Sequence, residues 1–230
     1  MILLDVFQKK VSTIHKSVYP KQEITLPISW FWNFFKLLHI YNINWIPTGY
    51  LSELLSRLRS MKKLEDLILT YKDFPKKGID FKDVLEILHY PDIFKEIILK
   101  MSSNKFLKNA EAIISIDARG FIFGSAIALE SSKPMIVARK PGKLPGHTLT
   151  REYDLEYGKN SLSIQSNALK KFNSFVIVDD LLAPGGTVNC VSRLLQDQRK
   201  EVLGLLTVVE LSKLKGRSKI DFAVESIISL

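Results

Sequence analysis

Four short apolar runs between residues 113 and 209 constrain the fold of this chain more than any other feature. They are rich in Ile and Val and lack strict alternation of apolar and polar residues, which is typical of strands in a parallel sheet covered on both faces. Strands are predicted at 113–116, 135–138, 175–178 and 202–209, and helices at 121–131 and 188–198. The sequence therefore predicts an open, mostly parallel α/β sheet with flanking helices, whose ligands bind beyond the carboxyl ends of the strands.

Two further helices are expected upstream of this sheet. Apolar residues at helical spacing predict a helix over 64–71, which the Pro- and Gly-containing segment 73–78 ends. Pro91 suits the first turn of a second helix, and an apolar stripe over 93–101 follows it.

The first 60 residues differ in composition from the rest of the chain. They hold all three tryptophans and 10 of the 23 aromatic residues. We therefore expect a boundary at Ser60–Met61, with an N-terminal extension of unknown role over 1–60 and the main domain over 61–230. The extension is either an accessory segment that packs on the rest or upstream sequence translated from an early start codon, with Met61 as the natural first residue.

The aromatic stretch 28–46 raises the question of a membrane contact. A spanning helix needs about 20 predominantly apolar residues with few charges, whereas Lys36, His39 and three asparagines interrupt this stretch. Interfacial anchoring through aromatic residues stays as the less favoured alternative. The chain also lacks the order of charged, apolar and small residues that marks a signal peptide.

Net charge and cysteine content narrow the partners and the compartment. A formal charge of +9 favours an acidic partner, which can be nucleic acid, anionic lipid or a phosphate-rich small molecule. The single cysteine, Cys190, cannot form an internal disulfide, so a reducing compartment and a cytoplasmic location are expected.

The loop after the run 175–178 carries the clearest chemical signal. Asp179 and Asp180 end the predicted strand, and Gly185, Gly186 and Thr187 open the next helix. Glycines allow a tight turn with inward N–H groups, and the start of a helix adds its positive dipole end, so this loop can hold one phosphate. No lysine follows the glycines, which excludes the common nucleotide-binding loop. The two carboxylates would repel a phosphate and are therefore expected to face sugar hydroxyls or a cationic transition state.

This segment resembles the binding signature for phosphoribosyl diphosphate (PRPP) in type I phosphoribosyltransferases. Further motifs resemble the adenine branch of that family: Asp-Ala-Arg-Gly at 117–120, Arg-Lys-Pro-Gly-Lys-Leu-Pro at 139–145, Leu-Glu-Tyr-Gly at 155–158 and Val-Glu-Leu-Ser-Lys-Leu-Lys-Gly-Arg at 209–217. The resemblance covers about 170 residues from Met61 onward and implies the family fold with a small hood over the site. It also implies transfer of 5-phosphoribosyl from PRPP to adenine, giving AMP and diphosphate, in a homodimer that binds no nucleic acid.

The same resemblance implies a role for each matching residue. Catalytic roles are expected of Asp179, Asp180, Glu156 and Arg119. PRPP is expected to contact Ala183, Pro184, Gly185, Gly186, Thr187, Ala118, Lys140, Arg139 and Tyr157. Adenine is expected to lie against Phe81, Lys82 and Leu181. Magnesium would enter bound mainly through PRPP oxygens and water, with no metal ligand assigned to the chain.

Two residues depart from the family pattern, and two other functions stay open. Pro184 stands where threonine is usual, which removes one N–H and one hydroxyl from the phosphate loop. Ala118 replaces a usual serine. The alternatives to adenine transfer are a purine- or PRPP-sensing regulator on the same fold and a transferase for another purine base. Residues 1–60 lack the basic recognition helix that a DNA-binding regulator would need.

Overall fold

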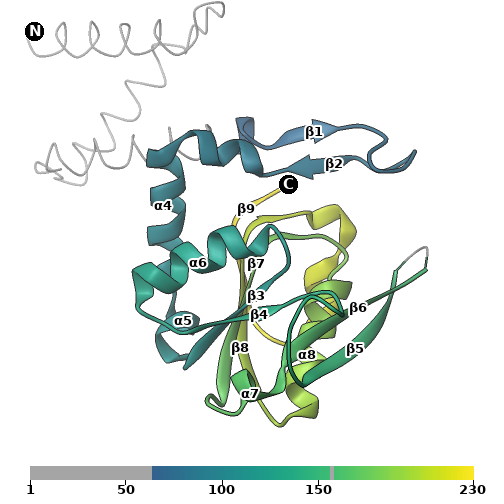
Figure 1. The fold of residues 1–230 in the computed structure, drawn as a ribbon. Helices are drawn as coiled ribbons and strands as arrows, with labels where there is room; N and C mark the ends of the chain where they lie inside the picture. The colour runs from purple at the N-terminus through teal and green to yellow at the C-terminus, as the bar shows by residue number, and fades with distance from the viewer. Residues whose placement is uncertain (1–63, 156–157) are drawn as a thin grey trace, which may run out of the picture. The chain divides into compact units, whose positions relative to one another are not determined.

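A five-stranded parallel sheet with strand order β4-β3-β7-β8-β9 forms the centre of the chain in the computed structural model (Figure 1). The structure describes residues 64–155 and 158–230, so the expected extension 1–60, the Ser60–Met61 boundary, the aromatic stretch 28–46, Glu156 and Tyr157 lie outside the described residues. The strands are β3 (Ala112–Ile116), β4 (Met135–Ala138), β7 (Ser174–Leu182), β8 (Glu201–Glu210) and β9 (Val224–Ser229). Because every pair in this sheet is parallel, all five carboxyl ends meet at one edge.

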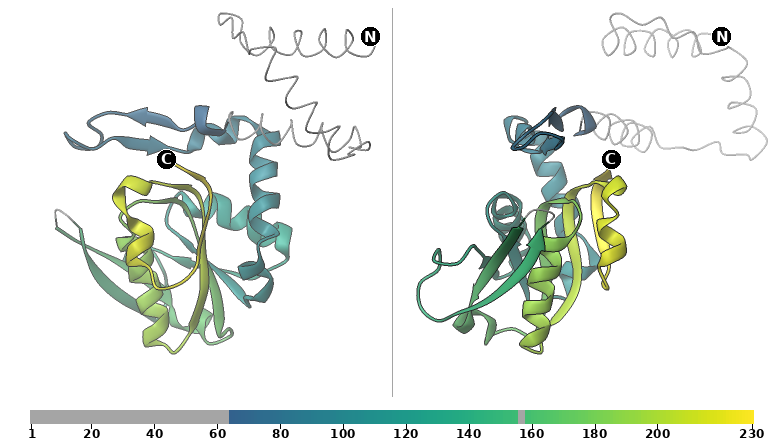
Figure 2. Two further views of the ribbon diagram at one scale, coloured as in Figure 1. Left: turned by 180° about the vertical axis from the view of Figure 1, so that it is seen from behind. Right: turned by 90° about the vertical axis from the view of Figure 1, so that its right-hand side faces the viewer.

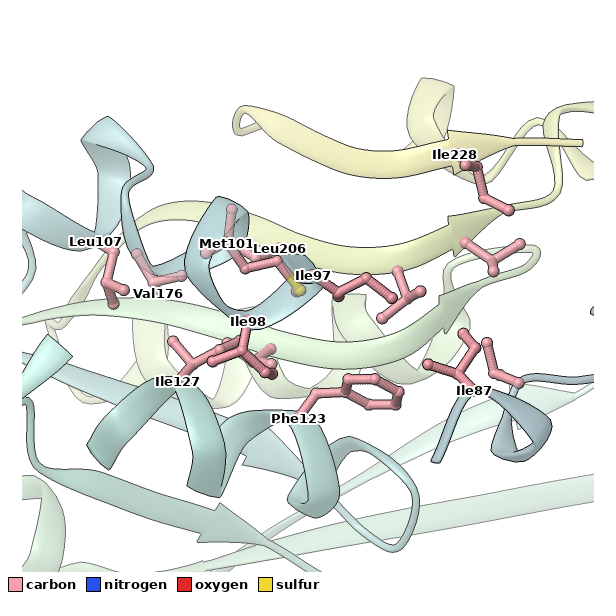
Figure 3. Packing of buried hydrophobic residues seen from close by; sticks show 14 of the residues in the cluster. Ile87, Ile97, Ile98, Met101, Leu107, Phe123, Ile127, Val176, Leu206 and Ile228 are labelled. Carbon is pink, nitrogen blue, oxygen red and sulfur yellow. The ribbon is translucent and has the colours of Figure 1, made fainter. Parts of the chain in front are cut away.

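Two apolar cores cover the two faces of this sheet. Val176 and Val178 of β7 face one core, whereas Phe175 and Ile177 face the other. Helices α4 (Pro91–Ser102) and α6 (Gly120–Ser131) pack on the first face, as Figure 3 shows for their apolar side chains, and α5 (Lys105–Asn109) adds Leu107 to the same core. Helices α7 (Ser166–Leu169) and α8 (Gly186–Asp197) contribute to the second core. Burial on both faces explains why the strands read as unbroken apolar runs.

The four predicted strands and the helices predicted at 91–101, 121–131 and 188–198 are confirmed, but β7 is longer than expected. The strand does not end at the carboxylates: it continues through Asp179 and Asp180 to Leu182, which pairs with Glu210 of β8. The short strand β9 was not predicted, because Glu225 and Ser226 interrupt its apolar residues.

The helix predicted over 64–71 is wrong in its second half. Only residues 64–66 are helical, and β1 (Leu69–Tyr71) pairs antiparallel with β2 (Phe81–Asp83). Leu64 and Ile68 are buried, which accounts for the helical spacing, but Tyr71 is 50% exposed and belongs to no apolar stripe. The segment 73–78 therefore turns a hairpin rather than ending a helix, with Gly78 at a positive φ of 88°.

Two hairpins lie outside the central sheet. The β1–β2 hairpin lies beyond the carboxyl edge of the sheet, near the C-terminus of the chain (Figures 1 and 2). It is followed by a 3-10 turn, η1 (Leu85–His89). The second hairpin, β5 (Thr148–Leu155) with β6 (Gly158–Gln165), was not predicted as an element and packs beside α8. Two more 3-10 turns, η2 (Ser212–Leu214) and η3 (Gly216–Lys219), connect β8 to β9. Among the described residues, no helix combines the length and the apolar character that crossing a bilayer requires.

Close packing of α6 on β3 gives a first prediction. A Cβ at Gly124 would lie 2.6 Å from the Cβ of Ser115, far inside van der Waals contact. Gly124→Ala is therefore expected to lower the free energy of unfolding by about 1–3 kcal/mol, measured by urea unfolding. The neighbouring exposed Ser125→Ala is the control and should change it by less than about 0.5 kcal/mol. Equal stability of the two variants would contradict this packing.

Candidate active site

Two adjacent carboxylates occupy the carboxyl end of the central strand β7. Asp180 is only 3% exposed, and its backbone N–H donates a hydrogen bond of 2.9 Å to Oδ1 of Asp179. A Cβ on Gly120 would lie 2.8 Å from the same Oδ1. Glycine at the start of α6 therefore allows the helix to begin directly beside the acid pair.

Burial makes this pair costly to ionise. The pKa of Asp179 is raised well above its usual value, first by burial and then by the neighbouring charge of Asp180. Burial also raises the pKa of Asp180, and the Arg119 guanidinium opposes that rise. A ligand that donates hydrogen bonds to these oxygens would relieve part of the cost.

Arg119 joins the acid pair to the β1–β2 hairpin. Its Nε lies 2.8 Å from Oδ2 of Asp180, and its guanidinium carbon lies 4.9 Å from the centre of the Phe81 ring. Its Nη1 also donates a long hydrogen bond of 3.5 Å to the carbonyl oxygen of Lys82. The structure thus brings two residues with predicted catalytic roles, Asp180 and Arg119, together with the two predicted base-binding residues of the hairpin.

The adjacent loop at the end of β4 is held by a second ion pair. Arg139 Nε lies 3.0 Å from Oδ2 of Asp117, and its guanidinium carbon lies 5.7 Å from the centre of the Phe121 ring. Lys140 is exposed next to it, and Ala118 is exposed in the turn between β3 and α6. Asp117 was not singled out from the sequence, because its partner is distant along the chain.

The glycine loop stands at the start of α8, as expected. Gly185 has a positive φ of 85°, so a residue with a side chain would be strained there. Its carbonyl oxygen accepts a hydrogen bond of 2.9 Å from the backbone N–H of Asn189. Pro184 is exposed, whereas Ala183, Gly186 and Thr187 are half-buried.

Thr187 has a neighbour that sequence reasoning missed. Its Oγ1 lies 3.2 Å from the hydroxyl oxygen of Tyr153 on β5, so the two hydroxyls form a hydrogen bond. The alternation of apolar and polar residues in 148–155 was a signal for this strand, but nothing in the sequence indicated its partner. Leu181 is half-buried and packs against the first core.

Comparison with known proteins identifies the family. The sequence model of the phosphoribosyl transferase domain matches residues 83–229. A curated adenine phosphoribosyltransferase of Prochlorococcus marinus strain AS9601 is 84% identical over 170 residues, which are 74% of this chain and 100% of that relative. The chain belongs to the adenine phosphoribosyltransferase family. It is accordingly a glycosyltransferase of the pentosyl-transferring class and serves purine salvage.

Solved structures of adenine phosphoribosyltransferases share the fold. The enzyme from Thermoanaerobacter pseudethanolicus is 38% identical, with a TM-score of 0.69, over 74% of this chain and 99% of its own. The Saccharomyces cerevisiae enzyme, solved with an imino-altritol bisphosphate and adenine, is 31% identical with a TM-score of 0.67, again over 74% of this chain and 99% of its own. The expected type I phosphoribosyltransferase fold is therefore confirmed.

The raised pKa of Asp179 predicts that keeping this carboxylate ionised lowers the stability of the fold. A carboxyl whose pKa is higher folded than unfolded lowers stability increasingly as pH rises from the unfolded value to the folded one. Asp179→Asn removes this cost, so the variant should melt higher than the parent by at least about 2 °C at pH 8, with a smaller gain at pH 5. Thermal unfolding at the two pH values is the measurement.

The exposed Asp221→Asn serves as the matched control for that measurement and should show no pH-dependent gain. A lower melting temperature of Asp179→Asn at pH 8 would show that the buried carboxylate stabilises the fold instead.

Proposed function

We propose that this site transfers a 5-phosphoribosyl group from PRPP to N9 of adenine, which yields AMP and diphosphate. The observation that carries the proposal is the position of Arg119, which contacts both Asp180 and Phe81. One side chain thereby links the groups suited to a sugar with the ring suited to a purine. The family membership supports the same chemistry.

The acid pair is suited to the sugar. Asp179 and Asp180 accept hydrogen bonds from the ribose hydroxyls, which offsets the cost of their burial. The bond from C1 of the ribose to diphosphate breaks ahead of the new bond to N9, so the sugar carries positive charge in between. Two carboxylates beside it stabilise that charge.

The basic residues are suited to the leaving diphosphate. Arg119, Arg139 and Lys140 follow the carboxyl ends of neighbouring strands β3 and β4, so their charges can converge on one ligand. When Arg119 turns toward the diphosphate, the face of Phe81 becomes available for adenine to stack on. The carbonyl oxygen of Lys82 can then accept from the exocyclic amine, and Leu181 lies on the other side of the base.

The glycine loop and the second hairpin complete the proposed site. Backbone N–H groups over 183–187 and the hydroxyl of Thr187 hold the 5′-phosphate at the start of α8. By the family resemblance, Glu156 is expected near the reaction centre and Tyr157 is expected to help close the site over PRPP. A carboxylate beside the base can exchange a ring proton or stabilise developing positive charge. Closure excludes water, which would otherwise hydrolyse PRPP.

We also propose that the reaction uses Mg²⁺ held mainly by PRPP oxygens and water. Among residues 64–155 and 158–230, no cluster of three His, Cys, Asp or Glu side chains could enclose an ion, and Asp179 and Asp180 offer at most two carboxylates. When bound, the ion would neutralise charge on the departing diphosphate.

The remaining expectations are also proposals: a homodimer, a cytoplasmic location, and a domain that begins near residue 61. The full length of the Prochlorococcus marinus relative is matched by 170 residues, which is the length of 61–230. This match supports the proposed boundary.

A single assay tests the reaction. Purified full-length chain is incubated with Mg²⁺, PRPP and each purine base in turn, and the products are identified. AMP should form from adenine, and Asp180→Asn should reduce its formation by at least about 100-fold because a group facing the cationic sugar is lost. Asp221→Asn, an exposed carboxylate, is the control and should retain activity.

Two outcomes would contradict the proposal. A nucleotide product from another base, with none from adenine, would change the substrate. Unchanged turnover of Asp180→Asn would remove the acid pair from the mechanism.

Pro184 gives a separate prediction about affinity. Threonine at this position restores an N–H and a hydroxyl at the phosphate loop, and a hydrogen bond to a charged group contributes about 1.5–3 kcal/mol. Pro184→Thr should therefore bind PRPP about 10- to 100-fold more tightly in calorimetry. Pro134→Thr is the control and should leave the affinity for PRPP unchanged, because Pro134 precedes β4 and so lies at the amino ends of the strands, away from the proposed site. Equal affinity of all three proteins would show that the loop does not use this position.

A further inference from the structure

The segment that follows β8 lies directly against the glycine loop. This segment, residues 211–219, contains η2 and η3 and is called the strap here. It lies beside the N-terminal end of α8, where Asn189 Nδ2 donates a hydrogen bond of 3.0 Å to the carbonyl oxygen of Lys219 (Figures 1 and 2). The strap carries no residue expected to touch substrate.

Gly216 makes the closest approach between the strap and the loop. A Cβ at Gly216 would overlap the carbonyl oxygen of Ala183 and come within 3.2 Å of the Leu182 side chain. From the other side, a Cβ at Gly185 would lie 3.2 Å from the carbonyl oxygen of Gly216. Backbone therefore packs on backbone here, and any shift of the strap is passed on to the loop.

An ion pair fixes the strap next to this contact. Arg217 Nε donates to both carboxylate oxygens of Glu210, at 3.0 and 3.1 Å, and Nη2 donates to Oε2. Arg217 Nη1 also donates to the carbonyl oxygen of Val224, at 2.6 Å, and Ser226 Oγ donates to Oε2 of Glu210, at 3.1 Å. These contacts tie the strap to the carboxyl end of β8 and to the first half of β9.

Glu210 is a costly residue to bury without this partner. It is 6% exposed at the end of β8, where it pairs in register with Leu182, the residue before Ala183. The hydrogen bonds from Arg217 hold the pKa of Glu210 below its usual value. Because guanidinium and carboxylate are both planar, a bidentate pair fixes orientation as well as distance.

We propose that Glu210 and Arg217 are positioning residues that press Gly216 against Ala183 and thereby set the backbone geometry of the phosphate loop. The proposal rests on the proposed role of residues 183–187 in holding the 5′-phosphate. Neither side chain touches the substrate in this scheme. Both act through the carbonyl of Ala183, which belongs to the same turn as Gly185.

Binding of ribose 5-phosphate and of diphosphate separates positioning from general damage. Ribose 5-phosphate probes the loop, whereas diphosphate probes Arg119 and Lys140 at the other end of the site. Gly216→Ala should weaken ribose 5-phosphate binding about tenfold or more, because its methyl group displaces the Ala183 carbonyl. Arg217→Met should weaken it about three- to tenfold. Diphosphate binding should stay within about twofold for both variants.

The double variant gives the sharper test. Releasing the ion pair lets the strap move away from the larger residue, so Gly216→Ala with Arg217→Met should bind ribose 5-phosphate no more weakly than Gly216→Ala alone. Arg217→Lys keeps the positive charge but cannot form the bidentate pair, so its affinity for ribose 5-phosphate should lie between those of Arg217→Met and the parent. Lys213→Met removes a charge from an exposed position of the strap and is the matched control.

The outcomes distinguish this proposal from the one on which it rests. If the parent protein binds no ribose 5-phosphate, the proposed role of the glycine loop fails. If the parent binds it and both single variants bind equally well, the positioning role fails. Equal losses for ribose 5-phosphate and diphosphate would assign the pair to general stability, as would additive losses in the double variant.

Discussion

Two neighbouring carboxylates at the end of a strand buried on both faces are the constraint on which the site depends. Water would normally solvate such charges, but Asp180 is almost fully enclosed. The fold compensates with the Arg119 guanidinium beside Asp180 and with the backbone N–H of Asp180, which donates to Asp179. Glycine at the start of α6 is a consequence, since a side chain there would collide with Asp179. The acid pair, the arginine and the glycine therefore form one unit rather than three independent motifs.

The parallel sheet explains how residues far apart in sequence meet. Each strand delivers its following loop to the same edge, so Arg119 after β3, Arg139 after β4 and the glycine loop after β7 become neighbours. The hairpin β1–β2 adds Phe81 from outside the sheet, and Arg119 is its link to the acid pair. The two cores lie on opposite faces of the sheet, and each contains alternate residues of the strands. Because both cores are closely packed, they keep the carboxyl ends of the strands rigid.

The features predicted correctly from the sequence are those that neighbouring residues along the chain determine. The strands at β3 and β4 were predicted to within one residue because burial on both faces leaves continuous apolar runs. The helix over 64–71 failed because Leu64, Leu67 and Ile68 reach the core from one helical turn and the bend after it, and pairing with β2 determined the rest. The acid pair and glycine loop were recognisable from order and spacing. The contacts of Arg119 with Phe81, of Tyr153 with Thr187 and of Arg217 with Glu210 were not, because each joins elements that only the tertiary fold brings together.

The strand order has a consequence for synthesis of the chain. β7 is the central strand, and it pairs with β3 on one side and β8 on the other, so that Ile114 lies next to Ile177. During translation, β3 and β4 leave the ribosome before β7, and β8 and β9 follow it, so these two pairs of strands cannot join into one sheet until β7 has been made. The strand that carries the acid pair is thus also the one that joins the two halves of the sheet. A nascent chain that stops short of it holds only the β3–β4 pair of this sheet.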